Sequence, residues 1–199
     1  MSLITVIKGK YMHEDRILIN KLKNFENINS NFLTITLILI GSILLAISAK
    51  VQVPFWPVPM TMQTFVIFLI GMTYSIRLSF ATVAFYLFQG AIGLPVFAAG
   101  GGIAYLVGPT AGYLYGMLFA SIVISYFANL GFSKTYFKAA LSLLIGSVVI
   151  FSFGIMYLGY IIGFEKALAA GLLPFIPSEL LKIALAVALI PTLHKIIKK

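Results

Sequence analysis

Apolar residues run through most of this chain in long stretches, which polar segments and segments rich in glycine or proline separate. A helix that crosses a membrane needs about 20 apolar residues, with a range of about 17 to 25. After a polar beginning, six stretches approach that length, and a tight turn around residues 75–77 separates the two shortest. We therefore predict six membrane-spanning helices, at residues 31–50, 59–75, 77–92, 109–130, 136–162 and 174–194.

The composition supports an all-α integral membrane protein. The 199 residues are 61% hydrophobic and 10% charged, whereas soluble domains are roughly 45–50% apolar and 25% charged. The net charge of +9 comes from Lys and Arg in short loops and tails, which is the pattern of membrane topology and not of a nucleic-acid-binding surface. The absence of cysteine excludes disulfides and thiolate metal sites.

The first 30 residues form a separate polar segment ahead of the membrane domain, which we place at residues 31–199. This segment is too long and too charged to be an ordinary cleaved signal peptide. Leu18, Leu22, Phe25 and Ile28 have helical spacing, so the segment is either a helix on the membrane surface or a disordered tail.

The distribution of basic residues predicts that both termini are cytoplasmic. Eleven of the 14 Lys and Arg residues lie in the two tails, at Arg77 and in the loop after the fourth span. The opposite side has Lys50 and Lys166, with Lys182 inside the sixth span. Cytoplasmic loops carry the excess of positive charge, so the loops at residues 51–58, 93–108 and 163–173 are predicted to be extracellular.

Glu179 and Lys182 are charged residues inside the sixth apolar stretch, near its predicted extracellular end. Three residues apart on a helix, they share one face. A charge at membrane depth costs about 2.5–3.5 kcal/mol, and such residues commonly face a bundle interior or a wet cavity. Pro177 is predicted to begin this helix, whose N-terminal N–H groups add positive potential. The pair therefore predicts a site for an anionic or strongly accepting ligand, although a lysine that snorkels to the surface is the alternative.

A glycine-rich segment at residues 93–108 is predicted to fold over this site. Eight of the 17 glycines lie between Gly90 and Gly116, and a continuous helix would not tolerate residues 100–102. Irregular backbone at membrane depth is tolerated where it lines a cavity. Gly112 and Gly116 are instead predicted to allow close helix packing. Trp56, in the proline-rich loop, is either an interface anchor or part of a ligand lid.

Four ordered motifs resemble those of the BioY family, the biotin-binding S-components of energy-coupling-factor (ECF) transporters. Residues 57–64 read PVPMTMQT, residues 90–98 GAIGLPVFA, residues 108–116 GPTAGYLYG and residues 177–182 PSELLK. The resemblance covers roughly residues 32–193. It implies a six-helix protein of the bacterial cell membrane that binds biotin near its extracellular face, with biotin as the transported substrate and no cofactor.

Several positions depart from the family pattern. The family usually has Asp at Glu179 and Gly at Ser178 and Ala111, and some members carry an arginine within the glycine-rich loop, where residues 100–102 offer none. The carboxylate is kept but moved by one methylene group. Without the arginine, Lys182 is the cation left for the ligand.

The resemblance gives the charged residues a ligand whose chemistry suits them. Glu179 can accept from the ureido N–H groups of biotin, and Lys182 can donate to the ureido oxygen or pair with the valerate carboxylate; both options stay open. Amphipathic and amide side chains suit the rest of a half-polar ligand, although interface anchoring is the alternative for each tyrosine. The further candidates are Tyr86, Gln89, Tyr105 and Tyr113.

The resemblance also implies protein partners, a transmembrane coupling subunit and paired ATPases. The sequence contains no Gly-x-x-x-x-Gly-Lys-Ser/Thr motif, so any ATP use belongs to another protein. Ser42 and Ala46, four residues apart, resemble the small-residue pattern by which S-components contact the coupling subunit. Packing within the bundle is the alternative.

Two other functions remain to be compared with biotin capture. One is a stand-alone membrane carrier for biotin or another small vitamin. The other is an intramembrane enzyme, which the sequence argues against because His13 and His194, its only histidines, lie in the tail and at the cytoplasmic end. No Ser–His pair or metal cluster can then form at the extracellular face.

Overall fold

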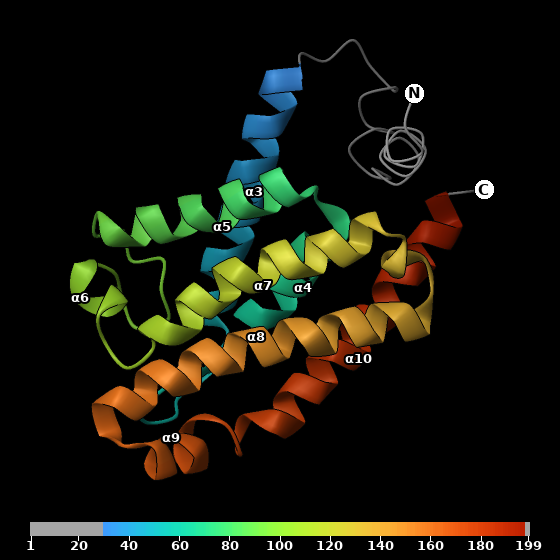
Figure 1. Cartoon of the computed structure of the whole chain (residues 1–199). Helices are drawn as coiled ribbons and strands as arrows, with labels where there is room; N and C mark the ends of the chain where they lie inside the picture. Colours follow the sequence, from blue (N-terminus) through green and yellow to red (C-terminus); the bar gives the residue numbers. More distant parts are fainter. Residues whose placement is uncertain (1–29, 198–199) are drawn as a thin grey trace, which may run out of the picture.

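A computed structural model describes residues 30–197, which form helices, one small hairpin and the loops between them (Figure 1). The predicted surface helix or tail lies outside these residues, apart from Ser30, and stays a prediction. The elements are α3 (Ser30–Lys50), β1 (Gln52–Val53), β2 (Met60–Thr61), α4 (Gln63–Thr73), α5 (Ile76–Ala91), α6 (Ile103–Leu106), α7 (Ala111–Asn129), the 3-10 helix η1 (Phe132–Lys134), α8 (Tyr136–Ile162), α9 (Phe164–Gly171) and α10 (Phe175–Ile197).

The described residues confirm the all-α class, and each predicted span overlaps one helix. Four helices, α3, α7, α8 and α10, are long and apolar enough to cross a membrane. The 11 residues of α4 extend about 16 Å at 1.5 Å per residue, against roughly 30 Å of hydrocarbon. The second span begins later than predicted because Met60 and Thr61 pair with β1, Thr61 opposite Gln52 and Met60 opposite Val53.

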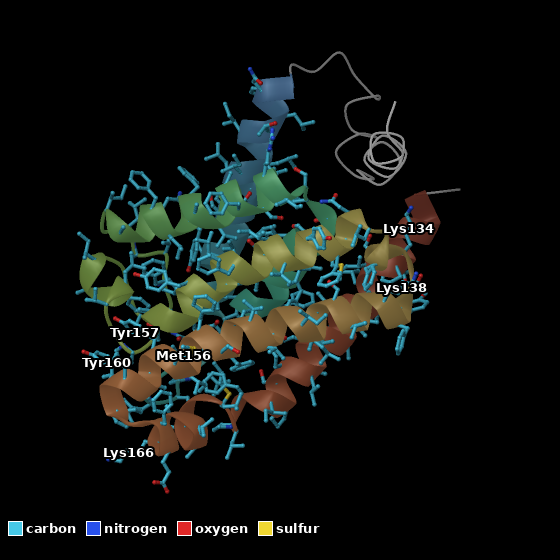
Figure 2. All side chains as sticks on the ribbon, in the orientation of Figure 1. Lys134, Lys138, Met156, Tyr157, Tyr160 and Lys166 are labelled. Atoms are coloured by element: carbon cyan, nitrogen blue, oxygen red, sulfur yellow. The ribbon has the colours of Figure 1, made fainter. Side chains whose placement is uncertain are left out.

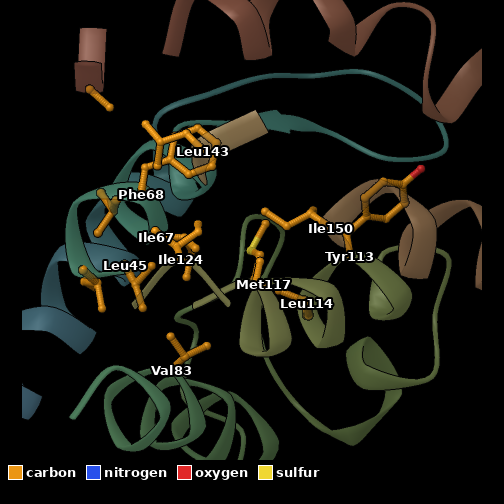
Figure 3. Packing of buried hydrophobic residues seen from close by; sticks show 14 of the residues in the cluster. Leu45, Ile67, Phe68, Val83, Tyr113, Leu114, Met117, Ile124, Leu143 and Ile150 are labelled. Atoms are coloured by element: carbon orange, nitrogen blue, oxygen red, sulfur yellow. The ribbon is translucent and has the colours of Figure 1, made fainter. Parts of the chain in front are cut away.

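The helices pack around α7, which contacts α4, α5 and α8 (Figure 1). α10 lies along α8 and α4 on one side, and α3 crosses α5 and α4 on the other. Side chains from seven of the helices, α3, α4, α5, α7, α8, α9 and α10, meet in the core between them. Figure 3 shows Leu45 of α3, Ile67 and Phe68 of α4, Val83 of α5, Tyr113, Leu114, Met117 and Ile124 of α7, and Leu143 and Ile150 of α8.

The glycine-rich loop (residues 93–108) interrupts the helical structure, as predicted. Gly93, Gly100 and Gly102 have φ angles of 98°, 140° and 99°, a region that favours glycine. α6, with four residues, is the one helical turn in the loop. Phe97 is fully buried and lies where a side chain at Gly90 would have to be, so the loop is anchored in the bundle by one aromatic ring.

The close approach of α7 and α8 depends on Gly112 and Gly116, as predicted. A Cβ atom at Gly116 would lie 2.8 Å from the carbonyl oxygen of Ile150 and 2.9 Å from its Cα atom. One at Gly112 would meet the backbone of Phe153. The obstacles are backbone atoms, which cannot rotate away, so the two helices can touch at these positions only without side chains.

We predict that Gly116→Ala lowers the free energy of unfolding by about 1–3 kcal/mol, the usual cost of overpacking. Gly108→Ala is the matched control, because its added Cβ would meet nothing closer than 3.4 Å. Thermal unfolding of the detergent-purified proteins measures both. Equal midpoints for the two variants would contradict this account of the helix contact.

Candidate functional site

Glu179 and Lys182 are buried together on α10, with 4% and 6% of their surface exposed. Lys182 Nζ lies 3.3 Å from Glu179 Oε2, which confirms that the two side chains meet. α10 begins at Phe175, so the predicted start at Pro177 was wrong by two residues. Because the effect of a helix terminus falls off beyond the first turn, Lys182 gains less from it than predicted.

Hydroxyl groups from two other helices complete the hydrogen bonding of the charge pair (Glu179 and Lys182). Thr64 of α4 donates to Glu179 Oε2 over 2.8 Å and accepts from Lys182 Nζ over 3.1 Å. Ser147 of α8 donates to Glu179 Oε1 over 3.1 Å. Both carboxylate oxygens therefore have donors, and α4, α8 and α10 meet at one polar point inside an apolar bundle.

The charge pair lines a small cavity, the site cavity, of about 40 Å³. Four helices, the hairpin and the glycine-rich loop contribute to its lining. The residues are Val58, Pro59 and Thr61 of the hairpin, Gln63 and Thr64 of α4, Ala98, Tyr105 and Thr110 around the glycine-rich loop, Tyr113, Leu114 and Met117 of α7, Ile150 and Phe151 of α8, and Phe175, Glu179 and Lys182 of α10.

A second polar group faces the cavity from the start of α4. Gln63 is buried, its Nε2 donates to Tyr86 Oη over 2.8 Å, and its Oε1 accepts from Thr61 Oγ1 over 3.0 Å. Tyr86 in turn donates to the backbone oxygen of Val96 over 3.1 Å. The amide is thus held in a fixed orientation beside the cavity, and Tyr86 joins it to the glycine-rich loop.

Aromatic rings form the apolar part of the cavity wall. Tyr113 stacks on Phe175 with ring centroids 6.3 Å apart, and Phe151 meets both rings edge-on. The Tyr113 hydroxyl donates to the backbone oxygen of Gly171 over 2.9 Å, which points it away from the charges. Tyr105 stacks on Phe97 at 4.9 Å. The site combines an acceptor, a cation and an amide with an aromatic wall, which suits a small ligand that is half polar and half apolar.

An apolar groove of about 390 Å³ lies on the other side of the charge pair, between α8, α9 and α10. Ser147 and Glu179 are its polar residues, together with Ser152, and the rest of its lining is hydrocarbon. Glu179 and Phe151 line both the groove and the site cavity. The wall between the two spaces is therefore formed by these shared side chains.

The structure brings together four of the six predicted ligand residues, since Glu179, Lys182, Tyr105 and Tyr113 line the cavity. Tyr86 contacts Gln63 but does not line the cavity. Gln89 lines a separate hollow beside Ser42 and Ala46, where its Oε1 is buried without a partner among the described residues. Ser42 has no exposed surface, which agrees with packing inside the bundle.

Three residues of the site, Gln63, Thr64 and Ser147, were missed by the sequence analysis. Gln63 and Thr64 belong to the motif at residues 57–64, and two adjacent polar residues at the start of an apolar helix were an available signal. Ser147 lies in a uniform apolar stretch with other serines, so nothing marked it. Within residues 30–197, no three His, Cys, Asp or Glu residues form a group that could hold a metal.

Sequence comparisons place the chain among transport proteins. Residues 21–199 match the model of the BioY family. A probable biotin transporter BioY of Pyrococcus horikoshii is 37% identical over 77% of this chain and 91% of its own length. One from Rickettsia prowazekii is 34% identical over 83% and 85%. The biotin transporter BioY of Thermotoga maritima is 35% identical over 77% and 90%.

The fold agrees with these matches. The crystal structure of the S-component for biotin from an ECF-type ABC transporter superposes with a TM-score of 0.74. The alignment covers 84% of this chain and 93% of that one, at 25% sequence identity. The similarity therefore extends over most of both molecules.

We predict that Thr64→Val lowers the free energy of unfolding by about 1–3 kcal/mol, because it removes one of the three hydrogen bonds to Glu179 and one of the two acceptors of Lys182 in a buried site. Thr64→Ser, which keeps the hydroxyl, is the matched control. Thermal unfolding in detergent checks both variants. If valine and serine behave alike, the hydroxyl does not hold the charge pair.

Proposed function

The chain belongs to the BioY family, and we propose that it is a membrane-embedded S-component that binds biotin in the site cavity for uptake. The buried charge pair beside that cavity carries the proposal. An ion pair that served only to stabilise the fold would be weak, because desolvation offsets most of its attraction. Here the pair instead lines a cavity whose other walls include aromatic rings. BioY relatives are transporters, not enzymes.

The two ends of biotin match the two halves of the cavity. A ureido ring offers two N–H donors and one strong acceptor, to which Glu179, Lys182 and Gln63 are the complementary partners. Charge-assisted hydrogen bonds of this kind contribute about 1.5–3 kcal/mol each. Of the three N–H groups of Lys182, two have acceptors among the described residues, which leaves one for the ligand. The rings of Tyr113, Phe151 and Phe175 suit the apolar thiophane ring.

Binding requires the cover of the cavity to move. Pockets for small molecules measure roughly 300–1,000 Å³, whereas this cavity measures about 40 Å³. The walls are packed helices, but the hairpin and the glycine-rich loop are short irregular segments. We infer that these two segments swing outward to admit biotin and then close over it.

The proposed topology has six passes with both termini cytoplasmic. α4 and α5 complete the six passes although each is shorter than the membrane, because the hairpin and the glycine-rich loop extend them. Lys134 and Lys138 lie at one end of α8 and Lys166 lies near the other (Figure 2). The end with the larger positive charge faces the cytoplasm, which puts the site cavity on the extracellular side.

We propose that the energy for uptake comes from a coupling subunit and ATPases, as the ECF-type structure suggests. The helix α3 offers a partner the surface around Ala46, which is half-buried, whereas Ser42 is occupied inside the bundle. Co-purification of ATPase and coupling subunits with the tagged chain tests this part. Competition of labelled biotin by unlabelled vitamins distinguishes a biotin protein from a carrier of another vitamin.

We predict that Lys182→Ala abolishes measurable biotin binding while membrane insertion stays intact. The change removes the cation of the site and leaves the Glu179 carboxylate unpaired. Titration of purified protein with labelled biotin measures the loss. Lys166→Ala, at an exposed lysine of α9, is the control and should bind like the unaltered protein. Tight binding by Lys182→Ala would place the site elsewhere.

A further inference from the structure

Two side chains attach the glycine-rich loop to α3 and to the hairpin. Lys50, the last residue of α3, donates from Nζ to the backbone oxygen of Phe97 over 2.6 Å. Gln52, in the first strand of the hairpin, donates from Nε2 to the backbone oxygen of Ala98 over 3.2 Å. Ala98 itself lines the cavity. The glycine-rich loop is thus tied to the end of α3 by one hydrogen bond and to the hairpin by the other, next to the site.

Packing is loose where these bonds are made. A hollow of about 370 Å³ separates the end of α3 from the first half of the glycine-rich loop. Its lining includes Lys50 together with Leu94, Pro95 and Val96. Apolar contact contributes little across such a gap, so the hydrogen bonds supply much of the attachment between α3 and the loop. One of them has a charged donor, which makes it the stronger of the two.

On the other side, the glycine-rich loop is fixed to the bundle through Phe97. Its ring lies edge-on to Tyr86 at 5.4 Å and is stacked with Tyr105, which lines the cavity. The Lys50 bond is made to the backbone of this same residue. A shift at Phe97 therefore moves Tyr105 over the cavity, and the bond from Lys50 opposes that shift.

We propose that Lys50 and Gln52 are positioning residues that latch the glycine-rich loop in its closed position, Lys50 to the end of α3 and Gln52 to the hairpin. The latch rests on the proposed function, because it controls access of biotin to the charge pair. Opening is needed for biotin to enter and again for it to leave. The same bonds oppose both events, so the latch slows both rates and has little effect on the equilibrium affinity.

Lys50→Met tests the latch, because methionine keeps much of the apolar stem and removes the donor. We expect the association and dissociation rate constants for biotin each to rise roughly tenfold, the order set by one charge-assisted hydrogen bond. The dissociation constant should change less than about threefold. Lys50→Arg keeps a cationic donor and should restore slow exchange, and Lys166→Met is the matched control at an exposed lysine. An unchanged or slower association rate overturns the proposal.

If Lys50→Met does not fold, Gln52→Met is the second test. It should raise the same two rate constants for biotin by a smaller factor, and unchanged rate constants overturn the proposal. Amide hydrogen exchange measures the stability of the closed loop without biotin. The informative amides are those of Phe97 and Gly102, which donate to the backbone oxygens of Gly100 and Gly90. Both amides should exchange faster in Lys50→Met than in the unaltered protein, while the amides of α8 exchange at the same rate in both. Equal exchange rates of the loop amides in the two proteins would overturn the latch. If the unaltered protein shows no saturable biotin binding, the proposed function fails instead, and the exchange experiment still tests the latch.

Discussion

Burying two opposite charges inside an apolar bundle is the constraint on which the rest of the structure depends. Burying Glu179 and Lys182 without partners would be costly, because the loss of hydration costs several kcal/mol per ion. Thr64 and Ser147 supply those partners from two other helices. Each hydrogen bond restricts the position of one helix relative to α10. The hydrogen bonding of the Glu179 carboxylate therefore constrains how α4, α8 and α10 pack together. The hydrogen bonds of the site thus contribute to the packing of these helices, and the packing in turn positions the side chains of the site.

The remaining helices make this polar point compatible with a compact bundle. Close contact at Gly112 and Gly116 draws α7 against α8, which brings Tyr113 and Phe151 together above the charges. Residues of the hairpin and of the glycine-rich loop line the same cavity. The charge pair is 4–6% exposed, and a low local dielectric strengthens its hydrogen bonds.

The sequence predicted those features that depend on spacing along one helix or on local backbone chemistry. The contact between Glu179 and Lys182, the interruption of helix near residues 100–102 and the close packing at Gly112 are of this kind. Features that depend on which helices become neighbours could not be predicted from spacing along the sequence. Ser147 becomes a donor because α8 passes beside α10, and Gln89 falls outside the cavity because α5 turns that face toward α3. The short length of α4 likewise arises from strand pairing between residues that are seven and nine positions apart.

The groove between α8 and α10 has a consequence for the surroundings of the site. Glu179 and Phe151 line both the groove and the site cavity, so two side chains separate the proposed ligand site from the apolar groove. Any lipid or detergent tail that fills the groove packs against the back of the binding site. The affinity of the protein is then a property of the protein and its amphiphile together, and values measured in detergents of different tail length need not agree with one another or with those in a membrane.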